Sequence, residues 1–500
     1  MTQVPTPTTG VVFPATDGLR PAHRGADGAR STSALGRAVL ADALRQADPV
    51  GARAVAAETN WRREYRVHFR RLVEAGLADP AAARTIASDG LASVHTRMRF
   101  ATPAGETTIA EALTSQPSGG APLDTVTVEG RAPAQTTLTL PYRGERLSGA
   151  ALHRQLDRWV GAGVIEPSCA EAVRLVADNP DWLRLDGRRV VVLGAGAEMG
   201  PLTALLRWGA EVAAVDLPRP AMWQRILTTV DRHAGRVHLP VSPDHDLASG
   251  VGLGADLRQD LPRVCQWLAD QPGPLVLGNY VYAEGAAHVQ VTMAVDGLTE
   301  HLRARRSDLT LAFLATPTDV FAVPADAVEE ANRRYAEGGG ISRIRRPARM
   351  LSAGRLFARN YPPGADPGIN DSLVLQQGPN YALAKRLQRW RATVARQQGT
   401  PVSLRVAPAT RTRSVVKNRL LAAAYAGAHR FGIEVFEPAT SNTLMAALLV
   451  HDLRVDRPAA EHPWQEEAFA AAHGGLWRQP YAPRSVLGIA VLLGAGAARG

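Results

Sequence analysis

Lysine is almost absent from this sequence. Only two of the 57 basic residues are lysines, Lys385 and Lys417, and all the others are arginines. A lysine ammonium is a compact point charge on a flexible stem, whereas an arginine guanidinium is a planar fork, so the two are not interchangeable at a chemical site. A lysine kept in an arginine-rich chain is therefore a candidate for chemistry. Lys385 is the stronger candidate because Tyr381 stands four residues before it.

Cysteine and long apolar runs are also scarce. The two cysteines, Cys169 and Cys265, cannot build a disulfide framework, so we expect a reducing, cytoplasmic location. The first residues lack the basic-then-apolar profile of a signal peptide. The longest apolar stretch, residues 486–498, is too short and too rich in glycine to cross a bilayer. We therefore expect no integral membrane span.

The net charge of +10 is compatible with anionic partners. However, the arginines are scattered among acidic residues, apart from a local cluster within residues 343–349. No zinc-finger, RRM or helix-turn-helix signature accompanies them. The sequence therefore predicts neither a nucleic-acid partner nor a metal site. It predicts a small-molecule substrate, and it is compatible with a homo-oligomer.

Composition changes along the chain predict several segments. Residues 1–34 are rich in Pro, Thr, Gly and Ala without apolar periodicity, which predicts a disordered tail. Residues 35–186 show mainly helical patterns and predict an N-terminal helical domain. Within this domain, residues 123–128 and 136–142 are strand-like and predict a hairpin with a long loop.

Strands alternate with helices from residue 187 to residue 455. This alternation predicts an α/β fold with a doubly wound parallel sheet and helices on both faces. The expected strands comprise residues 190–193, 212–215, 237–241, 275–278, 309–314, 373–375 and 402–406. Residues 320–380 are too long for a simple loop and predict an inserted lid hinged at residues 338–340, or an oligomerisation arm. Residues 456–500 form a C-terminal extension.

A glycine-rich turn follows the strand at residues 190–193. Gly194, Gly196 and Gly200 lie between this strand and a helix, where glycines permit a tight turn and let phosphate oxygens approach backbone amides. Asp216 ends the next strand, where a carboxylate reaches an adenosine ribose. Strand, turn, helix, second strand and acid occur in the order that nucleotide binding requires.

Tyr381 and Lys385 are one helical turn apart, so the ammonium is expected beside the phenol. A neighbouring cation favours the phenolate and lowers the tyrosine pKa. At about 4 Å and an effective dielectric constant of about 20, the attraction is roughly 4 kcal/mol, which is about three pKa units. The pair therefore predicts a tyrosine tuned for general acid–base catalysis.

Several segments in the same order complete a resemblance. Five features follow one another along the chain in this order: the outer glycines of the turn, an Ala-Asp-Leu segment with Asp256, the strand that ends at Asn279, the Tyr381–Lys385 helix, and the strand at residues 402–406 followed by Thr410. Together, residues 188–454 resemble the short-chain dehydrogenase/reductase family, which has a Rossmann-like fold.

The resemblance implies an NAD(P)-dependent oxidoreductase that interconverts a carbonyl and an alcohol. Tyr381 would be the general acid/base, and Lys385 would also contact the nicotinamide ribose. Because the family's catalytic serine is missing before Tyr381, Thr316 or Thr318 would polarise the substrate oxygen. The turn glycines, Asp216, Asp256, Asn279 and Thr410 would bind the cofactor. Asp216 would repel a 2′-phosphate, so NAD is expected over NADP.

Two alternatives stay open at this stage. One is an S-adenosylmethionine-dependent methyltransferase, since Gly194, Gly196 and Asp216 also suit an adenosyl ligand. The methyltransferase hypothesis gives the Tyr381–Lys385 pair no role. The other is a non-catalytic nucleotide-binding scaffold or sensor with the dehydrogenase fold. Glu198, which replaces the family's middle glycine, and the missing serine favour that second alternative.

Overall fold

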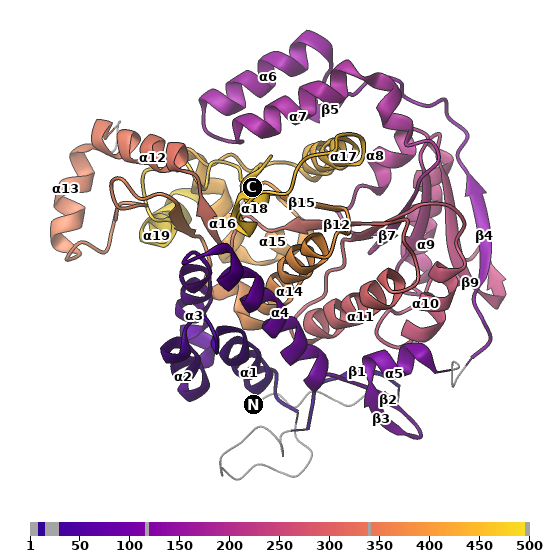
Figure 1. Cartoon of the computed structure of the whole chain (residues 1–500). Helices are drawn as coiled ribbons and strands as arrows, with labels where there is room; N and C mark the ends of the chain where they lie inside the picture. Colours follow the sequence, from indigo (N-terminus) through magenta and orange to yellow (C-terminus); the bar gives the residue numbers. More distant parts are fainter. Residues whose placement is uncertain (1–8, 16–29, 116–119, 339–341, 496–500) are drawn as a thin grey trace.

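An eight-stranded, mostly parallel sheet forms the centre of the computed structural model (Figure 1). The structure describes residues 9–15, 30–115, 120–338 and 342–495. The strand order is β10-β9-β8-β7-β11-β12-β15, and β4 pairs antiparallel with β9. The strands are β4 (Asp124–Glu129), β7 (Arg189–Leu193), β8 (Glu211–Val215), β9 (Arg236–Asp246), β10 (Val251–Leu253), β11 (Leu275–Asn279), β12 (Leu309–Ala315) and β15 (Val402–Val406). The predicted doubly wound α/β fold is confirmed.

The central strand β7 shows why the sheet strands are continuous apolar runs. Val190 and Val192 belong to one hydrophobic core, whereas Val191 and Leu193 belong to the core on the opposite face. Successive side chains of a strand point to opposite faces. A strand that is covered on both faces therefore needs apolar residues at every position.

Helices cover the two faces as separate layers (Figure 1). One layer contains α10 (Leu261–Ala269), α11 (Ala286–Arg303) and α14 (Gly378–Gln397), overlaid by α1 (Thr32–Leu44), α2 (Pro49–Ala57), α3 (Trp61–Gly76), α4 (Pro80–Arg97) and α5 (Ile109–Thr114). The other contains α6 (Gly149–Gly161), α7 (Pro167–Asp178), α8 (Leu202–Arg207), α9 (Pro220–Asp231) and α17 (Pro438–Arg454), with the 3-10 helix η2 (Pro180–Arg184) beside them. The N-terminal helices thus share a core with the sheet.

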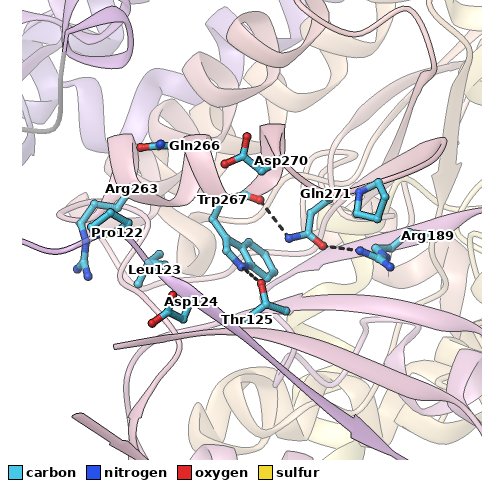
Figure 2. A pocket seen from close by; sticks show the side chains of 11 residues that line it. Pro122, Leu123, Asp124, Thr125, Arg189, Arg263, Gln266, Trp267, Asp270 and Gln271 are labelled. Carbon is cyan, nitrogen blue, oxygen red and sulfur yellow. Dashed lines mark hydrogen bonds between the residues drawn. The ribbon is translucent and has the colours of Figure 1, made fainter. Parts of the chain in front are cut away.

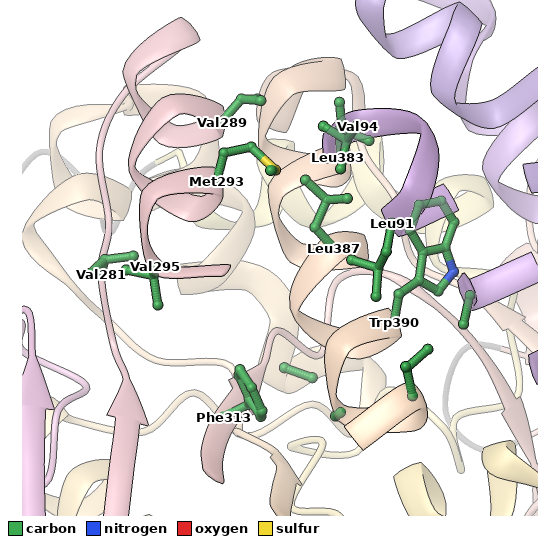
Figure 3. Close-up of a cluster of buried hydrophobic side chains, with 14 of the residues drawn as sticks. Leu91, Val94, Val281, Val289, Met293, Val295, Phe313, Leu383, Leu387 and Trp390 are labelled. Atoms are coloured by element: carbon green, nitrogen blue, oxygen red, sulfur yellow. The ribbon is translucent and has the colours of Figure 1, made fainter. Parts of the chain in front are cut away.

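Apolar packing fixes the position of α14, which carries Tyr381 and Lys385. Leu383 and Leu387 of α14 lie beside Met293 of α11, and Trp390 packs against α4 (Figure 3). An added Cβ at Gly90 of α4 would stand 2.3 Å from the Trp390 ring, so only glycine allows this approach. The start of α14 is thereby held at the carboxyl edge of the sheet.

The N-terminal region differs from its prediction in two ways. β1 (Gly10–Val12) pairs with β2 (Arg99–Thr102), which in turn pairs with β3 (Gly105–Thr108), so part of the expected disordered tail is a buried strand. Helix α1 also begins within the expected tail, at Thr32, and residues 1–8 and 16–29 lie outside the described residues.

The predicted hairpin between residues 123–128 and 136–142 is wrong. β4 instead completes the edge of the central sheet at β9, while β5 (Leu140–Tyr142) pairs with β6 (Glu145–Leu147). The edge of a sheet offers unpaired N–H and C=O groups, and β4 satisfies those of β9.

The predicted strand at residues 373–375 is also wrong. The insertion contains β13 (Val320–Val323), α12 (Ala325–Glu337), α13 (Ser342–Leu351), β14 (Gly368–Asp371) and the 3-10 helix η4 (Leu375–Gln377). β13 pairs with β14, and Phe321 packs on Trp477 with ring centroids 5.4 Å apart. Of the proposed glycine hinge, Gly338 ends α12 in the left-handed region, and residues 339 and 340 lie outside the described part.

The C-terminal part of the chain adds further short helices. They are α15 (Arg413–Lys417), α16 (Arg419–Ala428), η5 (His429–Phe431), α18 (Pro463–Ala468) and α19 (Pro483–Gly494). Among the helices that the structure describes, none combines the length and apolar character needed to span a membrane.

Candidate active site

The strand order changes direction at β7, which lies between β8 and β11. In doubly wound sheets, ligands bind at the carboxyl ends of the strands at such a switch point. The glycine turn follows β7 directly, and Gly194 has a φ of +85°. An added Cβ at Gly194 would stand 2.9 Å from the Tyr280 carbonyl oxygen, so the turn packs tightly against the end of β11.

Asp216 closes the glycine turn from the end of β8. Its Oδ2 accepts a hydrogen bond from the Gly196 amide at 2.7 Å, and its Oδ1 accepts one from the Leu217 amide at 2.7 Å. Burial raises the pKa of Asp216, and these two amides act in the opposite direction. Asp216 therefore lies where the sequence predicts it, but both carboxylate oxygens are engaged by the protein.

Glu198 ties the glycine turn to the segment after β15. Its Oε2 accepts a hydrogen bond from the Arg413 amide at 2.8 Å, and its Oε1 lies 3.1 Å from Arg413 Nε. On the other side of the turn, an added Cβ at Gly196 would stand 2.8 Å from Met222 Sδ. The Gly200 amide donates to the Ala197 carbonyl at 3.0 Å. The turn is thus filled by the chain's own groups.

Lys385 connects three elements of the sheet edge. Its Nζ donates to the Leu314 carbonyl of β12 at 3.3 Å and to Gln388 Oε1 at 3.1 Å. Gln388 Nε2 in turn donates to Oδ1 of Asn279, the last residue of β11, at 3.5 Å. Burial lowers the pKa of Lys385 to about 8, against the opposing charge of Asp319. The structure therefore brings Lys385 and Asn279 into one network.

Tyr381 lies in the first turn of α14 and is partly buried. Burial raises its pKa, and a hydrogen bond with the Thr316 hydroxyl acts in the opposite direction. This corrects the expectation that Lys385 lowers the phenol pKa. The physical reason is that burial penalises the phenolate, while the Lys385 ammonium is directed to the Leu314 carbonyl and to Gln388.

Thr316 and Thr318 both lie beside the start of α14. Their hydroxyl oxygens are 3.0 Å apart, and Gln377 Nε2 donates to Thr318 Oγ1 at 2.8 Å. Thr316 is the residue of the two that hydrogen-bonds with Tyr381. Of the two threonines, Thr316 is therefore the one next to the phenol.

His288 was missed by the sequence analysis. It lies on α11 with its ring centroid 5.3 Å from that of Tyr381 and 5.3 Å from that of Tyr282. Burial, together with the charge of Lys385, lowers the pKa of His288 to about 3. The signal in the sequence was a polar pair, His288 and Thr292, spaced by one turn on a helix that follows a sheet strand.

Two other predicted cofactor residues are engaged in internal contacts. Asp256 Oδ2 accepts a hydrogen bond from Arg258 Nη2 at 2.8 Å. The Thr410 hydroxyl donates to the Pro408 carbonyl at 2.9 Å and lies 2.6 Å from Ser441 Oγ. Both residues stand at the carboxyl edge of the sheet, but neither side chain is directed to the Tyr381–Lys385 network by these bonds.

A cavity of about 340 Å³ lies at the opposite edge of the sheet (Figure 2). Arg189, the first residue of β7, and Gln271, which precedes β11, line it together with Trp267, whose Nε1 donates to Thr125 Oγ1 at 2.8 Å. This cavity is far from Tyr381, because it adjoins the amino ends of the strands. The candidate site is therefore located by the residues Tyr381, Lys385 and Asn279 at the carboxyl edge, and not by this cavity.

Comparisons with known proteins identify no family for this chain. No family model matches it, and no curated protein matches it. One similar solved structure is a thiolation-reductase di-domain from an archaeal non-ribosomal peptide synthetase, with 11% sequence identity and a TM-score of 0.27. The match covers 56% of this chain and 55% of that chain, so this chain spans about half the length of that structure.

Proposed function

We propose that this chain binds a dinucleotide cofactor at the carboxyl edge of its sheet and interconverts a carbonyl and an alcohol as an oxidoreductase. The observation that carries the proposal is the joint position of Tyr381, Lys385 and Asn279. All three lie at the ends of β11 and β12 or at the start of α14, beside the strand-order switch at β7. Ligands bind at this place in doubly wound sheets.

The residues around the switch point fit such a cofactor in two of three places. Asp216 would hold the adenosine ribose, and Asn279 and Lys385 would hold the nicotinamide ribose. The carboxylate of Asp216 favours NAD over NADP. At the third place, the glycine turn, Glu198 and Arg413 must separate before a pyrophosphate can approach the turn amides. A bound nicotinamide would supply the hydride.

The chain's own residues then handle the proton. The raised pKa of Tyr381 keeps its phenol protonated at neutral pH, so the phenol is a proton donor for a substrate carbonyl oxygen. Thr316 orients the phenol through its hydroxyl. Lys385, whose pKa burial lowers to about 8, stays bonded to the Leu314 carbonyl and Gln388 one turn further along the helix.

A second candidate is a non-catalytic nucleotide-binding scaffold or sensor. The filled glycine turn favours it, because Glu198 is bound to Arg413 and the Gly196 amide is bound to Asp216. A methyltransferase remains a third outcome, but the Tyr381–Lys385 network has no part in methyl transfer.

Calorimetric titration of the purified chain with NADH, NADPH and S-adenosylmethionine separates these functions. We expect NADH to bind and to be oxidised in the presence of at least one member of a panel of aldehydes and ketones. Tyr381→Phe should abolish this oxidation and preserve NADH affinity, and the distant Tyr335→Phe should change neither. NADH binding without any oxidation supports the scaffold, and binding of S-adenosylmethionine alone supports the methyltransferase.

A further inference from the structure

His288 and Thr292 form a polar pair one turn apart on α11. Each residue is only 1% exposed. Nδ1 and Nε2 of His288 and Oγ1 of Thr292 have no hydrogen-bond partner within the described residues. Buried polar groups are almost always hydrogen-bonded, because an unpaired one loses its hydration without compensation. Two adjacent unpaired groups therefore indicate a binding partner from outside the chain.

The pair lies directly beside the proposed reacting group. The His288 ring is 5.3 Å from the Tyr381 ring, and Tyr282, whose ring is also 5.3 Å from that of His288, is 52% exposed. The exposed Tyr282 ring and the Tyr381 ring thus both lie beside the His288 ring. A ligand that touches the Tyr381 phenol would therefore lie close to the His288 ring.

The charge at this place favours an oxygen atom of the ligand. Burial keeps His288 neutral at physiological pH, with a pKa of about 3, so it retains one N–H donor and one acceptor nitrogen. Thr292 adds a hydroxyl donor. The positive charge of Lys385 acts on the same ring, and it favours an electron-rich partner such as a hydroxyl or carboxylate oxygen.

We propose that His288 and Thr292 bind a second oxygen of the substrate, carried by the carbon next to the carbonyl that Tyr381 protonates. The substrate class is then a hydroxyketone or a 2-oxo acid. This inference rests on the proposed function for the role of Tyr381. His288 and Thr292 act as specificity residues, because they contact the substrate but transfer no proton in the reaction.

Three ketones that differ at one carbon test the inference on the intact chain. They are 2-butanone, 1-hydroxy-2-butanone and 2-oxobutanoate, titrated by calorimetry with and without NADH. We expect at least one of the two oxygenated ketones to bind more than about tenfold tighter than 2-butanone, since a site built to hydrogen-bond an oxygen discriminates against ligands that lack it. The hydroxyl and carboxylate forms are distinguished by which of the two gains affinity.

Thr292→Val and His288→Phe should remove this preference and leave the affinity for 2-butanone unchanged. Thr299→Val is the matched control on the same helix: Thr299 is equally buried, but its hydroxyl donates to the Val295 carbonyl at 2.7 Å. The control should keep the ligand preference and lower the melting temperature. Thr292→Val should not lower the melting temperature, because no hydrogen bond within the protein is lost.

Each other outcome counts against the inference. Equal affinity for the three ketones, or no ketone binding at all, overturns it and leaves the proposed function to the NADH titration. A drop in melting temperature for Thr292→Val as large as that for Thr299→Val also overturns it, because the hydroxyl then has a partner within the protein. Failure to bind NADH and NADPH removes the proposed function, whereas the ketone affinities still decide the role of the pair.

Discussion

The carboxylate of Asp216 accepts a hydrogen bond from the amide of Gly196 at 2.7 Å, and so joins the end of β8 to the turn that follows β7. These are two of the residues that the sequence marks for nucleotide binding. In the structure they satisfy one another. A ribose must therefore compete with a backbone amide for the Asp216 oxygens.

Asp216→Asn should remove the preference for NADH over NADPH. The carboxylate repels a 2′-phosphate, and its hydrogen bonds to ribose hydroxyls are charge-assisted, which is worth about 1.5–3 kcal/mol. We therefore expect the NADH affinity of the variant to fall by roughly tenfold or more. Calorimetry with both reduced cofactors measures this, with the exposed Asp244→Asn as control. Tighter binding of NADPH than NADH by the unaltered chain would contradict the assignment.

Lys385→Arg should abolish most turnover although it preserves the charge. The guanidinium is larger and planar, and it cannot take the place of an ammonium between the Leu314 carbonyl and Gln388. General acid–base catalysis is worth about 10²–10⁴-fold, which sets the expected loss. The control is Lys417→Arg, which changes the chain's other lysine at an exposed position. Full activity of Lys385→Arg would remove the lysine from the mechanism.

The stability of the folded chain should rise between about pH 8 and pH 10.5 because of Lys385. Burial lowers its pKa from 10.5 to about 8, so within this range the unfolded chain holds a proton that the folded chain has released. Stability increases with pH wherever the unfolded state binds more protons, and this contribution is lost as the pH falls to about 8.

Lys385→Met tests that pH dependence. The melting temperature of the variant should change less than that of the unaltered chain between about pH 7 and about pH 10. Lys417→Met serves as the exposed control and should preserve the original dependence. Identical pH profiles for the unaltered chain and Lys385→Met would show that this ammonium does not titrate in the range.

Glu198→Gly should strengthen NADH binding. The substitution removes a carboxylate from the turn that would face the pyrophosphate, and it releases the Arg413 side chain from its ion pair at 3.1 Å. Relief of like-charge repulsion at this place should raise affinity by about tenfold. Calorimetric titration of the variant and of Arg413→Ala separates the two effects. Weaker binding by Glu198→Gly would mean that Glu198 holds the turn in its binding form.

Hydrogen exchange should show whether the insertion is a lid. α13 stands away from the sheet at the margin of the molecule, whereas every residue of β13 is buried (Figure 1). If residues 320–380 close over the substrate, amides of α13 should exchange more slowly when NADH and a ketone are both present. The amides of β13 should be protected in all conditions. Unchanged exchange in α13 would favour the oligomerisation arm.

Local patterns in the sequence were sufficient for most of the sheet and for part of the site. The strands β7, β8, β11, β12 and β15 lie where continuous apolar runs predict them, because burial on both faces leaves no place for alternation. Tyr381 and Lys385 lie on one helix, since their spacing of four residues places them on one helical face. Asp216 follows directly after β8, as predicted, because the apolar run of that strand ends at Val215.

Only the tertiary structure decided which distant groups meet. Three contacts join residues that are far apart in the sequence. Strand β4 pairs with β9, the Lys385 ammonium donates to the Leu314 carbonyl, and His288 lies beside Tyr381. Such contacts depend on how whole layers of helices pack on the sheet. Packing also buries the Tyr381 phenol, and this burial raises its pKa although a lysine stands one helical turn away. The sequence by itself determined most strands of the central sheet, the glycine turn and the helix that carries Tyr381 and Lys385, and packing determined the contacts and the protonation of these groups.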